Sequence, residues 1–390
     1  MKKMCIVTGT RAEYGLLSPL MSRLDSVDDV QLQIIATGAH LSPEYGETYT
    51  FIENDGFIID EKVEILLSSD SAVGVSKTFG LGVMGLAEAL VRLKPDMLIL
   101  LGDRYETLAA AVAASISKIP IAHLHGGETT EGAYDEAFRH AITKMSTVHF
   151  TSTESYRKRV IQLGENPSTV FNVGAIGIDN IVNMNLLTKS DLEDSLGLKF
   201  NDKLILATFH PVTLENHTSE TQFKELLTAL DEVDNATIIF TKANADNDGR
   251  IINQMIDHYV EQHSDKAIAF TSMGQLRYLS AMSVAHLVIG NSSSGIIEAP
   301  SFKVPTVNIG DRQKGRLQAE SVINAEPTAS SIRQAIQKCD SEAFVKMLET
   351  VSNPYGNGDT ASRIEDKLID VVSTIGDLKK VFYDLEVPDV

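Results

Sequence analysis

The chain has 390 residues, of which 43% are hydrophobic, and its mean hydropathy is close to zero. This length and composition indicate a folded protein with room for two domains of ordinary size, and they exclude a disordered chain. The 34 basic and 53 acidic residues give a formal net charge of -19, so we expect no affinity for nucleic acid or for anionic lipid surfaces.

The cysteines and the apolar runs bear on the compartment. Cys5 and Cys339 lie far apart and form no CxxC motif, which is typical of a reducing cytosol. The N-terminal residues run directly into an apolar strand without the apolar core of a signal peptide, and no apolar run approaches the length of a membrane span. We therefore expect a cytoplasmic protein with no membrane partner.

Short apolar runs recur in the first half of the chain, and each is followed by a turn and a helical pattern. Such alternation predicts a parallel sheet wrapped by helices. We expect strands at residues 4–8, 33–37, 97–101, 119–124 and 148–151, and a first helix after Gly15.

The glycine-rich residues 174–180 are typical of a crossover, after which a second series of strands begins. These strands are expected at residues 204–208, 237–241, 267–271, 286–289 and 306–309. The sequence therefore predicts an α/β protein with two Rossmann-like, doubly wound lobes, residues 1–175 and 176–361, and an interdomain cleft as the default ligand site. We expect a C-terminal helical segment, residues 362–390, to join the first lobe.

Two glycine-containing stretches in the first lobe predict different structures. The stretch Gly9-Thr-Arg-Ala-Glu-Tyr-Gly15 follows a strand and opens a helix, so we expect its amides and Arg11 to face a ligand at the carboxyl end of the sheet. Residues 80–85, Gly-Leu-Gly-Val-Met-Gly, match the dinucleotide pattern GxGxxG, but no strand directly precedes them. We interpret residues 80–85 as a glycine-rich loop.

Acidic side chains follow two neighbouring strands. Asp103 comes directly after the apolar run 97–101, where it is either a helix N-cap or a functional carboxylate. The residues after the next strand include His123, His125, Glu128, Glu131 and Asp135. The two histidines could hold zinc, but no third or fourth ligand is in register, so we favour general acid/base chemistry by the carboxylates. Arg139, in the next helix, is either a functional residue or a residue of a solvated helix face, and the sequence supports the two interpretations equally.

In the second lobe, His210 ends a strand and Pro211 turns the chain, so we expect this imidazole at the strand end as a phosphate-binding or acid group. Residues 246–249, Asp-Asn-Asp-Gly, resemble part of a calcium loop but lack its remaining ligands, and we interpret them as a turn. The sequence therefore predicts no metal site.

Residues 288–300, Val-Ile-Gly-Asn-Ser-Ser-Ser-Gly-Ile-Ile-Glu-Ala-Pro, have the order strand, loop, helix. Ser292, Ser293 and Ser294 would lie where the helix begins, and unpaired N–H groups and the helix dipole favour phosphate there. Glu298 would accept hydrogen bonds from both hydroxyls of a ribose. The alternative is a serine-capped helix with the glutamate as its capping-box partner. Three serines exceed what a cap needs, so we favour a nucleoside diphosphate site.

Together these motifs resemble the hydrolysing UDP-N-acetylglucosamine 2-epimerases of the bacterial NeuC type, which open the sialic acid pathway. The resemblance covers nearly the whole chain and includes Gly-Thr-Arg-Ala-Glu-Tyr-Gly, Leu-Gly-Asp-Arg-Tyr-Glu, His-Leu-His-Gly-Gly-Glu, Phe-His-Pro and Gly-Asn-Ser-Ser-Ser-Gly. It implies the GT-B fold, UDP-N-acetylglucosamine as substrate and UDP as product, a homodimer or homotetramer, and neither a metal nor another cofactor.

The resemblance also implies roles for single residues. Ser293, Ser294 and Arg316 would hold the diphosphate, Glu298 the ribose, and Arg11 the region near the phosphates, with Ser292, Gly295, Asn244 and Arg277 as further UDP-binding residues. His210 would lie near the sugar and the leaving group. Asp103, Glu128 and Asp135 match acidic positions of the catalytic region. Some members have Glu where this chain has His125, so the base is either a carboxylate or His125.

The implied reaction is loss of UDP to form a glycal, followed by addition of water with inversion at C2. Three alternatives remain open at this point. They are the same reaction on a UDP-2,4-diacetamido-trideoxyhexose of the legionaminic acid pathway, a non-hydrolysing epimerase, and a GT-B glycosyltransferase.

Overall fold

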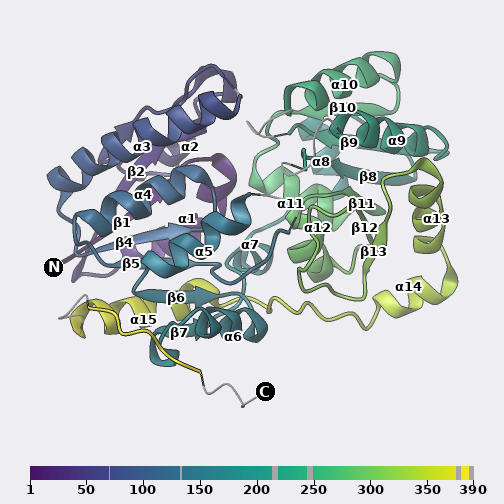
Figure 1. Ribbon diagram of the computed structural model, residues 1–390. Coiled ribbons are helices and arrows are strands. Elements are labelled where there is room, and N and C mark those ends of the chain that lie inside the picture. Colours follow the sequence, from purple (N-terminus) through teal and green to yellow (C-terminus); the bar gives the residue numbers. More distant parts are fainter. Residues whose placement is uncertain (70, 132–133, 213–217, 244–248, 375–378, 386–390) are drawn as a thin grey trace. The chain divides into compact units, whose positions relative to one another are not determined.

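The computed structural model describes residues 1–69, 71–131, 134–212, 218–243, 249–374 and 379–385 (Figure 1). By its internal contacts the chain divides into two compact units. The first comprises Met1–Glu128, Asp135–Asn180 and Tyr355–Val390, and the second comprises Thr129–Tyr134 and Ile181–Pro354. Each unit is built on one parallel sheet, which confirms the predicted class of two Rossmann-like α/β lobes.

The first unit contains a seven-stranded sheet in the order β3-β2-β1-β4-β5-β6-β7. Its strands are β1 (Lys2–Thr8), β2 (Val30–Thr37), β3 (Glu61–Val63), β4 (Met97–Leu101), β5 (Ile121–Leu124), β6 (Val148–Thr151) and β7 (Val170–Asn172). Its helices are α1 (Arg11–Asp25), α2 (Tyr49–Asn54), α3 (Ala72–Leu93), α4 (Tyr105–Ile116), α5 (Asp135–Met145), α6 (Glu154–Gln162) and α15 (Thr360–Thr374), and α7 (Gly177–Asn183) leads into the second unit.

The two faces of this sheet are covered by different helices. Successive side chains of a strand point to opposite faces, so Met4 and Ile6 pack with α1 and α15, whereas Cys5 and Val7 pack with α3 and α4. The central strands are apolar at both kinds of position because both faces are buried.

The C-terminal helix α15 is fixed to the first unit by its beginning and by its side. The Asp179 carboxylate accepts hydrogen bonds from the amides of Thr360, at 2.9 Å, and Ala361, at 2.6 Å, and so caps the first turn. Farther along, Glu365 forms an ion pair with Arg23 of α1. These contacts join a segment from the end of the chain to a unit that is otherwise built from its beginning.

The second unit contains a six-stranded sheet in the order β10-β9-β8-β11-β12-β13. Its strands are β8 (Lys203–Thr208), β9 (Ala236–Thr241), β10 (Ala267–Phe270), β11 (Leu287–Gly290), β12 (Thr306–Ile309) and β13 (Val322–Ala325). Its helices are α8 (Lys189–Leu196), α9 (Ser219–Asp231), α10 (Gly249–Gln262), α11 (Gln275–Ser283), α12 (Ser293–Ile297), α13 (Ala329–Cys339) and α14 (Glu342–Leu348). Aliphatic side chains from both faces of β8 and β11 form its two cores.

The GxGxxG stretch is helical, so its interpretation as a loop is wrong. Residues 80–85 lie inside α3. A Cβ on Gly85 would come within 2.6 Å of Val63 on β3, and one on Gly82 within 3.2 Å of Ala109 on α4. These two glycines therefore allow α3 to pack closely on its neighbours, and this tertiary gain outweighs their poor helix propensity.

α3 also differs from the expectation that no apolar run approaches a membrane span. Among the described helices it alone is long and apolar enough to cross a membrane, with a mean hydropathy of 1.2. A core helix of a globular protein can meet the same criteria of length and hydropathy.

Other differences concern short elements and element ends. The short strands β3, β7 and β13 were not predicted from the sequence. α1 begins at Arg11 rather than after Gly15, because the Thr10 hydroxyl accepts a hydrogen bond from the Glu13 amide and caps the helix.

Candidate active site

Asp103 lies in the loop after β4 and forms an ion pair with Arg139 of α5. The N-cap of α4 is Arg104, so the alternative that Asp103 caps this helix is wrong. Arg139 is buried, not on a solvated face, and its Nη1 also donates to the carbonyl oxygen of His125 at 3.1 Å. One guanidinium group therefore joins the ends of β4 and β5.

His123, on β5, is fully buried in the first unit. Its Nε2 lies 2.8 Å from the carbonyl oxygen of Gly102, which can only accept, so this nitrogen carries the proton. Its Nδ1 lies 3.1 Å from the Thr143 hydroxyl. Burial lowers the pKa of the imidazole to about 3. His123 is therefore a neutral core residue whose nitrogens both have protein partners.

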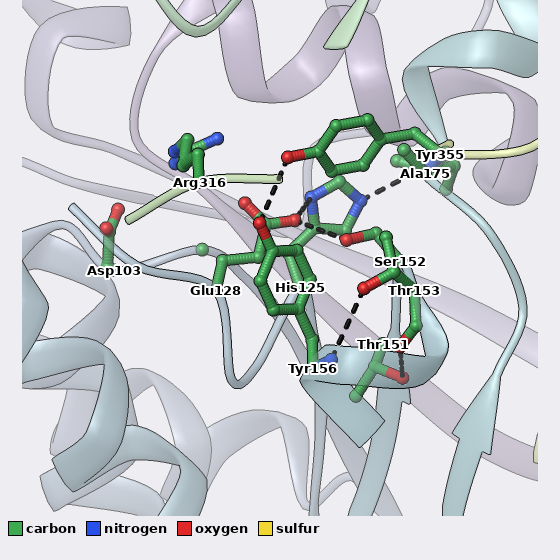
Figure 2. Close-up of polar contacts among 12 residues, drawn as sticks. Asp103, His125, Glu128, Thr151, Ser152, Thr153, Tyr156, Ala175, Arg316 and Tyr355 are labelled. Atoms are coloured by element: carbon green, nitrogen blue, oxygen red, sulfur yellow. Dashed lines mark hydrogen bonds and ion pairs between the residues drawn. The ribbon is translucent and has the colours of Figure 1, made fainter. Parts of the chain in front are cut away.

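Glu128 is the centre of a buried hydrogen-bond network (Figure 2). The Ser152 hydroxyl donates to Oε1 of Glu128 at 2.7 Å, and Nδ1 of His125 lies 3.1 Å from the same oxygen. The amide of Ile176 donates to Nε2 of His125 at 3.3 Å, so the proton of the neutral ring is on Nδ1 and points at Glu128. His125 thus orients the carboxylate with one nitrogen while the lone pair of the other is occupied.

The backbone of His125 is unusual as well. Its φ of 65° lies in the left-handed region, which few residues other than glycine adopt, although asparagine, aspartate and histidine do so more often than the rest. Such strain persists where surrounding contacts hold the residue, and it is common at functional sites. The geometry favours Glu128 over His125 as a proton-transfer group.

Asp135 begins α5 and is half-buried. The six residues between Glu128 and Asp135, Thr129–Tyr134, belong to the second unit. Within that unit, Nε of Arg316 donates to the carbonyl oxygen of Thr129 at 3.0 Å. The chain therefore leaves the first unit directly after one candidate carboxylate and returns at the next.

The loop before α1 is engaged by protein groups. The Arg11 guanidinium lies over the Phe51 ring, 3.7 Å from its centroid. The amide of Gly9, which we expected to face a ligand, donates to Glu13 Oε2 at 2.7 Å. Burial, and next the charge of Glu106, raise the pKa of the Glu13 carboxyl to about 7.

His210 follows β8 in the second unit and is buried. Its backbone is bonded to the side chain of Asn291, which follows the neighbouring strand β11. The two strands approach closely at Gly290, whose φ is 130° and whose missing Cβ would lie 1.8 Å from the carbonyl oxygen of Thr208. Only glycine fits there, so this residue lets the His210 loop lie against the serine stretch.

The serine stretch has the predicted order of strand, loop and helix, namely β11, Ser292 as the N-cap, and α12 beginning at Ser293. The Ser292 hydroxyl accepts a hydrogen bond from the Ser294 amide at 3.4 Å, so Ser292 does cap the helix. Glu298 lies at the C-terminal end of α12 and therefore cannot be a capping-box partner.

Glu298 is buried and lies beside two half-buried side chains, Ser294 and Tyr278 of α11. The Ser294 side chain lies beside both the Glu298 carboxyl group and the Tyr278 hydroxyl. Burial raises the pKa of the Glu298 carboxyl to about 7, and burial together with the Glu298 charge raises the pKa of Tyr278 to about 12. A buried carboxylate gains stability from added hydroxyl donors, as a ribose would supply.

The remaining predicted residues have different settings. Gly295 packs on β12, and its carbonyl oxygen accepts a hydrogen bond from the Thr306 hydroxyl at 2.9 Å. Arg277 is exposed on α11. Asn244 lies outside the described residues, as does most of the expected turn at 246–249. In the part of the chain that the structure describes, no group of three or more histidine, cysteine, aspartate or glutamate side chains could hold a metal ion.

Sequence reasoning missed Ser152, Asn291 and Tyr278 and did not decide between two interpretations of Arg139. Ser152 and Tyr278 carry no local pattern that marks them. Asn291 lies inside the serine stretch, but its partner His210 is far away in sequence. For Arg139 a signal was the apolar Ile142, three residues later on the same helix face, because a charged residue on a buried helix face needs a partner.

Comparisons with known proteins decide the family. The sequence profile described as UDP-N-acetylglucosamine 2-epimerase matches residues 22–369. The chain belongs to this family. The match confirms the resemblance that the motifs predicted.

Among its relatives, this member of the epimerase family is 47% identical over 343 residues to the GDP/UDP-N,N'-diacetylbacillosamine 2-epimerase (hydrolyzing) of Campylobacter jejuni, with 88% of each chain covered. It is 38% identical over 381 residues to the polysialic acid biosynthesis protein P7 of Escherichia coli, covering 97% of this chain and 95% of that protein.

Solved structures agree in fold. The S. aureus MnaA-UDP co-structure matches this epimerase-family chain with a TM-score of 0.80 at 19% identity, covering 98% of this chain and all of that one. The UDP-GlcNAc 2-epimerase of Neisseria meningitidis matches with a TM-score of 0.79 at 20% identity, covering 95% and 100%. These neighbours of GT-B-like fold confirm the predicted fold class.

Proposed function

We propose that this protein is a hydrolysing 2-epimerase that converts UDP-N-acetylglucosamine and water to N-acetylmannosamine and UDP. One geometric observation carries the proposal. Asp103, Arg139, His125 and Glu128 are linked by consecutive contacts, so two carboxylates are held at the ends of neighbouring strands in a member of the epimerase family. Relatives named as hydrolysing 2-epimerases support the same reaction type.

We assign the nucleotide to residues of the second unit. The diphosphate would be held by Ser293, Ser294 and Arg316, and the ribose hydroxyls by Glu298. The buried setting of Glu298 supports this role, because its carboxyl group lies beside Ser294 with little other solvation. Further UDP-binding candidates are Arg11, Asn244, Arg277, Ser292 and Gly295, and His210 would lie near the sugar and the leaving group.

The chemistry follows from the weak acidity of the sugar C2–H bond. Cleavage of the C1–O bond must run ahead, and donors that stabilise charge on the departing UDP assist it. A carboxylate then takes the C2 proton, and a C1–C2 double bond forms. Return of a proton to C2 from the other face and addition of water at C1 release N-acetylmannosamine. We assign proton transfer to Asp103, Glu128 and Asp135 and an orienting role to His125.

The decisive experiment is incubation with UDP-N-acetylglucosamine alone, followed by identification of the released sugar. Free N-acetylmannosamine and UDP are expected. In D₂O the product must carry deuterium at C2, and its absence there would exclude the elimination. A reaction that requires a second sugar or lipid acceptor would instead indicate a glycosyltransferase.

A second substrate is favoured by one observation. The relative from Campylobacter jejuni, at 47% identity, is named for N,N'-diacetylbacillosamine. We therefore propose the UDP-linked diacetamido sugar as the alternative substrate, with the same chemistry. Parallel measurement of kcat/KM for the two UDP-sugars separates them, and the preferred sugar should lead by at least tenfold, about 1.4 kcal/mol.

We further propose that the enzyme acts in the cytosol as a homo-oligomer on the route to a surface polysaccharide, without a metal or other cofactor. Both cysteines are buried and unpaired, as suits a reducing compartment. Activity should survive exhaustive treatment with EDTA. Loss of turnover that a divalent ion restores would contradict the metal-free reaction.

A further inference from the structure

Two segments of the first unit, one leading to the second unit and one returning from it, are bonded to each other. The chain leaves the first unit after Asn180 and returns to it at Tyr355. The Ala175 amide donates to the carbonyl oxygen of Tyr355 at 2.9 Å, and the Thr360 hydroxyl donates to the carbonyl oxygen of Ala175 at 3.4 Å. A Cβ on Gly174 would lie only 3.2 Å from the Tyr355 carbonyl oxygen, so glycine allows this close approach. We call these four bonded or packed residues, Gly174, Ala175, Tyr355 and Thr360, the junction.

The junction continues directly to the histidine that orients Glu128. The residue after Ala175 is Ile176, whose amide donates to Nε2 of His125 at 3.3 Å (Figure 2). The carbonyl oxygen of Tyr355 holds the peptide group just before this one, so it limits the directions that the Ile176 amide can take. Ala175, Ile176 and Tyr355 are each 0% exposed, so no solvent competes for these groups. The backbone of Tyr355 therefore supports His125 through a single intervening residue.

The side chain of Tyr355 reaches a second support of Glu128, the beginning of α6. Its hydroxyl lies 3.0 Å from the hydroxyl of Tyr156, in the first turn of α6, and both side chains are buried (Figure 2). Shortly before this turn, Ser152 donates to the Glu128 carboxylate. The same turn packs on the residue before Glu128, because a Cβ on Gly127 would lie 2.5 Å from the carbonyl oxygen of Tyr156. Tyr355 is therefore bonded to both structures that hold the carboxylate, to one by its carbonyl group and to the other by its hydroxyl.

We propose that Tyr355 is a positioning residue for the Glu128 carboxylate. A group that transfers a proton must be held within about 0.5 Å of its productive position, and the residues around it provide that precision. Loss of the Tyr355 hydroxyl loosens the start of α6 and, through the junction, the segment that binds His125. The reaction should then slow although every side chain assigned to proton transfer is still present. This inference rests on the proposed function, in which Glu128 transfers a proton.

The alternative is that the tyrosine pair stabilises the fold and nothing more. A buried hydroxyl with a partner contributes to stability wherever it lies, so a fall in stability alone does not separate the two roles. A loss of kcat at constant KM does separate them, as does a change in the His125–Glu128 contact itself.

Removal of single hydroxyl groups tests the role in catalysis. Tyr355→Phe keeps the ring and the backbone carbonyl group, and it should lower kcat by roughly 10–100-fold, as loss of a supporting contact does. KM and the affinity for UDP should change by less than about twofold, because the nucleotide is assigned to the second unit. Tyr156→Phe breaks the same hydrogen bond from the other side and should have a similar effect. The double variant Y156F/Y355F should lose less than the product of the two single losses, since the shared hydrogen bond can be lost only once. Steady-state kinetics and calorimetry with UDP measure these effects.

Tyr259 offers a matched control in the second unit. It is buried, and its hydroxyl donates to Oδ1 of Asp231 at 2.8 Å. Tyr259→Phe therefore removes the same atom from a comparable setting, and it should lower the midpoint of urea denaturation but leave kcat unchanged. An equal loss of kcat in Tyr259→Phe and Tyr355→Phe would overturn the proposal. So would wild-type kcat in both Tyr355→Phe and Tyr156→Phe.

Nuclear magnetic resonance of the full chain with ¹⁵N-labelled histidine tests the positioning without turnover. The Nδ1 proton of His125, which points at Glu128, should give a signal that is absent from His125→Asn. This signal should shift or broaden in Tyr355→Phe and stay in place in Tyr259→Phe. An unchanged signal in Tyr355→Phe would contradict the positioning role. If the signal responds as expected but the wild type releases no N-acetylmannosamine, the proposed function fails while the positioning of Glu128 by Tyr355 stands.

Discussion

Asn291 and His210 are joined by two hydrogen bonds that run in opposite directions. The amide of His210 donates to Oδ1 of Asn291 at 2.7 Å, and Nδ2 of Asn291 donates to the carbonyl oxygen of His210 at 2.8 Å. Both residues are buried, and the carbonyl oxygen of Asn291 itself accepts from Gln313 at 2.9 Å. The Asn291 side chain therefore provides hydrogen-bond partners for the backbone amide and carbonyl groups of His210. It also connects the loop after β8 to the start of the serine stretch.

Asn291→Ala is expected to lower the free energy of unfolding by about 2–3 kcal/mol, because it leaves a buried amide and a buried carbonyl group without partners. Turnover should fall as well, since His210 loses its fixed position. Urea denaturation gives the free energy. The exposed Asn183 offers a matched control, and Asn183→Ala should change it by less than about 0.5 kcal/mol. Equal stability of the two variants would show that the two hydrogen bonds between Asn291 and His210 contribute nothing to the free energy of unfolding.

The role of His125 can be separated from that of a base. His125→Gly tolerates the positive φ but removes the donor to Glu128, and it should reduce kcat by roughly 10–100-fold, as loss of an orienting partner does. His125→Asn also tolerates this backbone and keeps an N–H donor, so it should retain most of the activity. If both variants lose activity equally and beyond about 10³-fold, His125 is the proton-transfer group.

The carboxylates themselves should behave differently. Glu128→Gln, which keeps the size of the side chain, is expected to reduce turnover by about 10²–10⁴-fold while UDP affinity stays nearly constant. Ser152→Ala removes one of the donors to Glu128 and should cost less. Steady-state kinetics and calorimetry with UDP measure the two effects. Normal turnover of Glu128→Gln would remove this residue from the reaction.

The raised pKa of Glu298 predicts a pH-dependent affinity for UDP. An ionised carboxylate accepts stronger hydrogen bonds from ribose hydroxyls than a protonated one, so affinity should rise as the pH passes through about 7. Titration of UDP itself affects the wild type and Glu298→Gln alike, so Glu298→Gln should lack only the pH dependence of UDP affinity that comes from Glu298. Glu298→Ala should weaken UDP binding by about 1–3 kcal/mol. Calorimetry between pH 6 and pH 8 compares them. Parallel pH profiles for wild type and Glu298→Gln would contradict the ribose assignment.

The Glu165 carboxylate links the C-terminal segment to the first unit. Burial alone would raise its pKa, but hydrogen bonds from His149, Lys144 and Lys380 lower the pKa to about 2. The carboxyl of the unfolded chain titrates near 4.5, so this group stabilises the fold above that pH, and the stabilisation is lost as the pH falls toward 2.

Glu165→Gln should therefore lower the free energy of unfolding at pH 7 by about 2–3 kcal/mol, less than for a fully buried pair because both lysines are partly exposed. Urea denaturation from pH 7 down to pH 3 should show the difference from wild type shrinking. Glu53→Gln, which breaks an exposed ion pair with Lys62, is the control and should have little effect at any pH.

Local patterns predicted much of the fold. The runs that became β4, β6 and β12 were predicted with the observed bounds. β4 is apolar at every position because both of its faces are buried, whereas polar and apolar residues alternate in β6 and β12. The serine stretch was likewise legible, since its glycines, serines and aliphatic residues specify strand, loop and helix from neighbours alone. The motifs together also indicated the epimerase family, which the profile match confirmed.

What the tertiary structure decided depends on residues that are distant in sequence. Residues 80–85 have a loop-like composition, but Val63 lies too close to Gly85, and Ala109 close enough to Gly82, for a larger side chain to fit without movement of α3 or its neighbours. The tautomer of His125 that donates to Glu128 is set by the amide of Ile176, fifty-one residues later. A sequence pattern reports the preferences of neighbouring residues, whereas burial, tautomer and ion-pair partner are set by groups that only folding brings into contact.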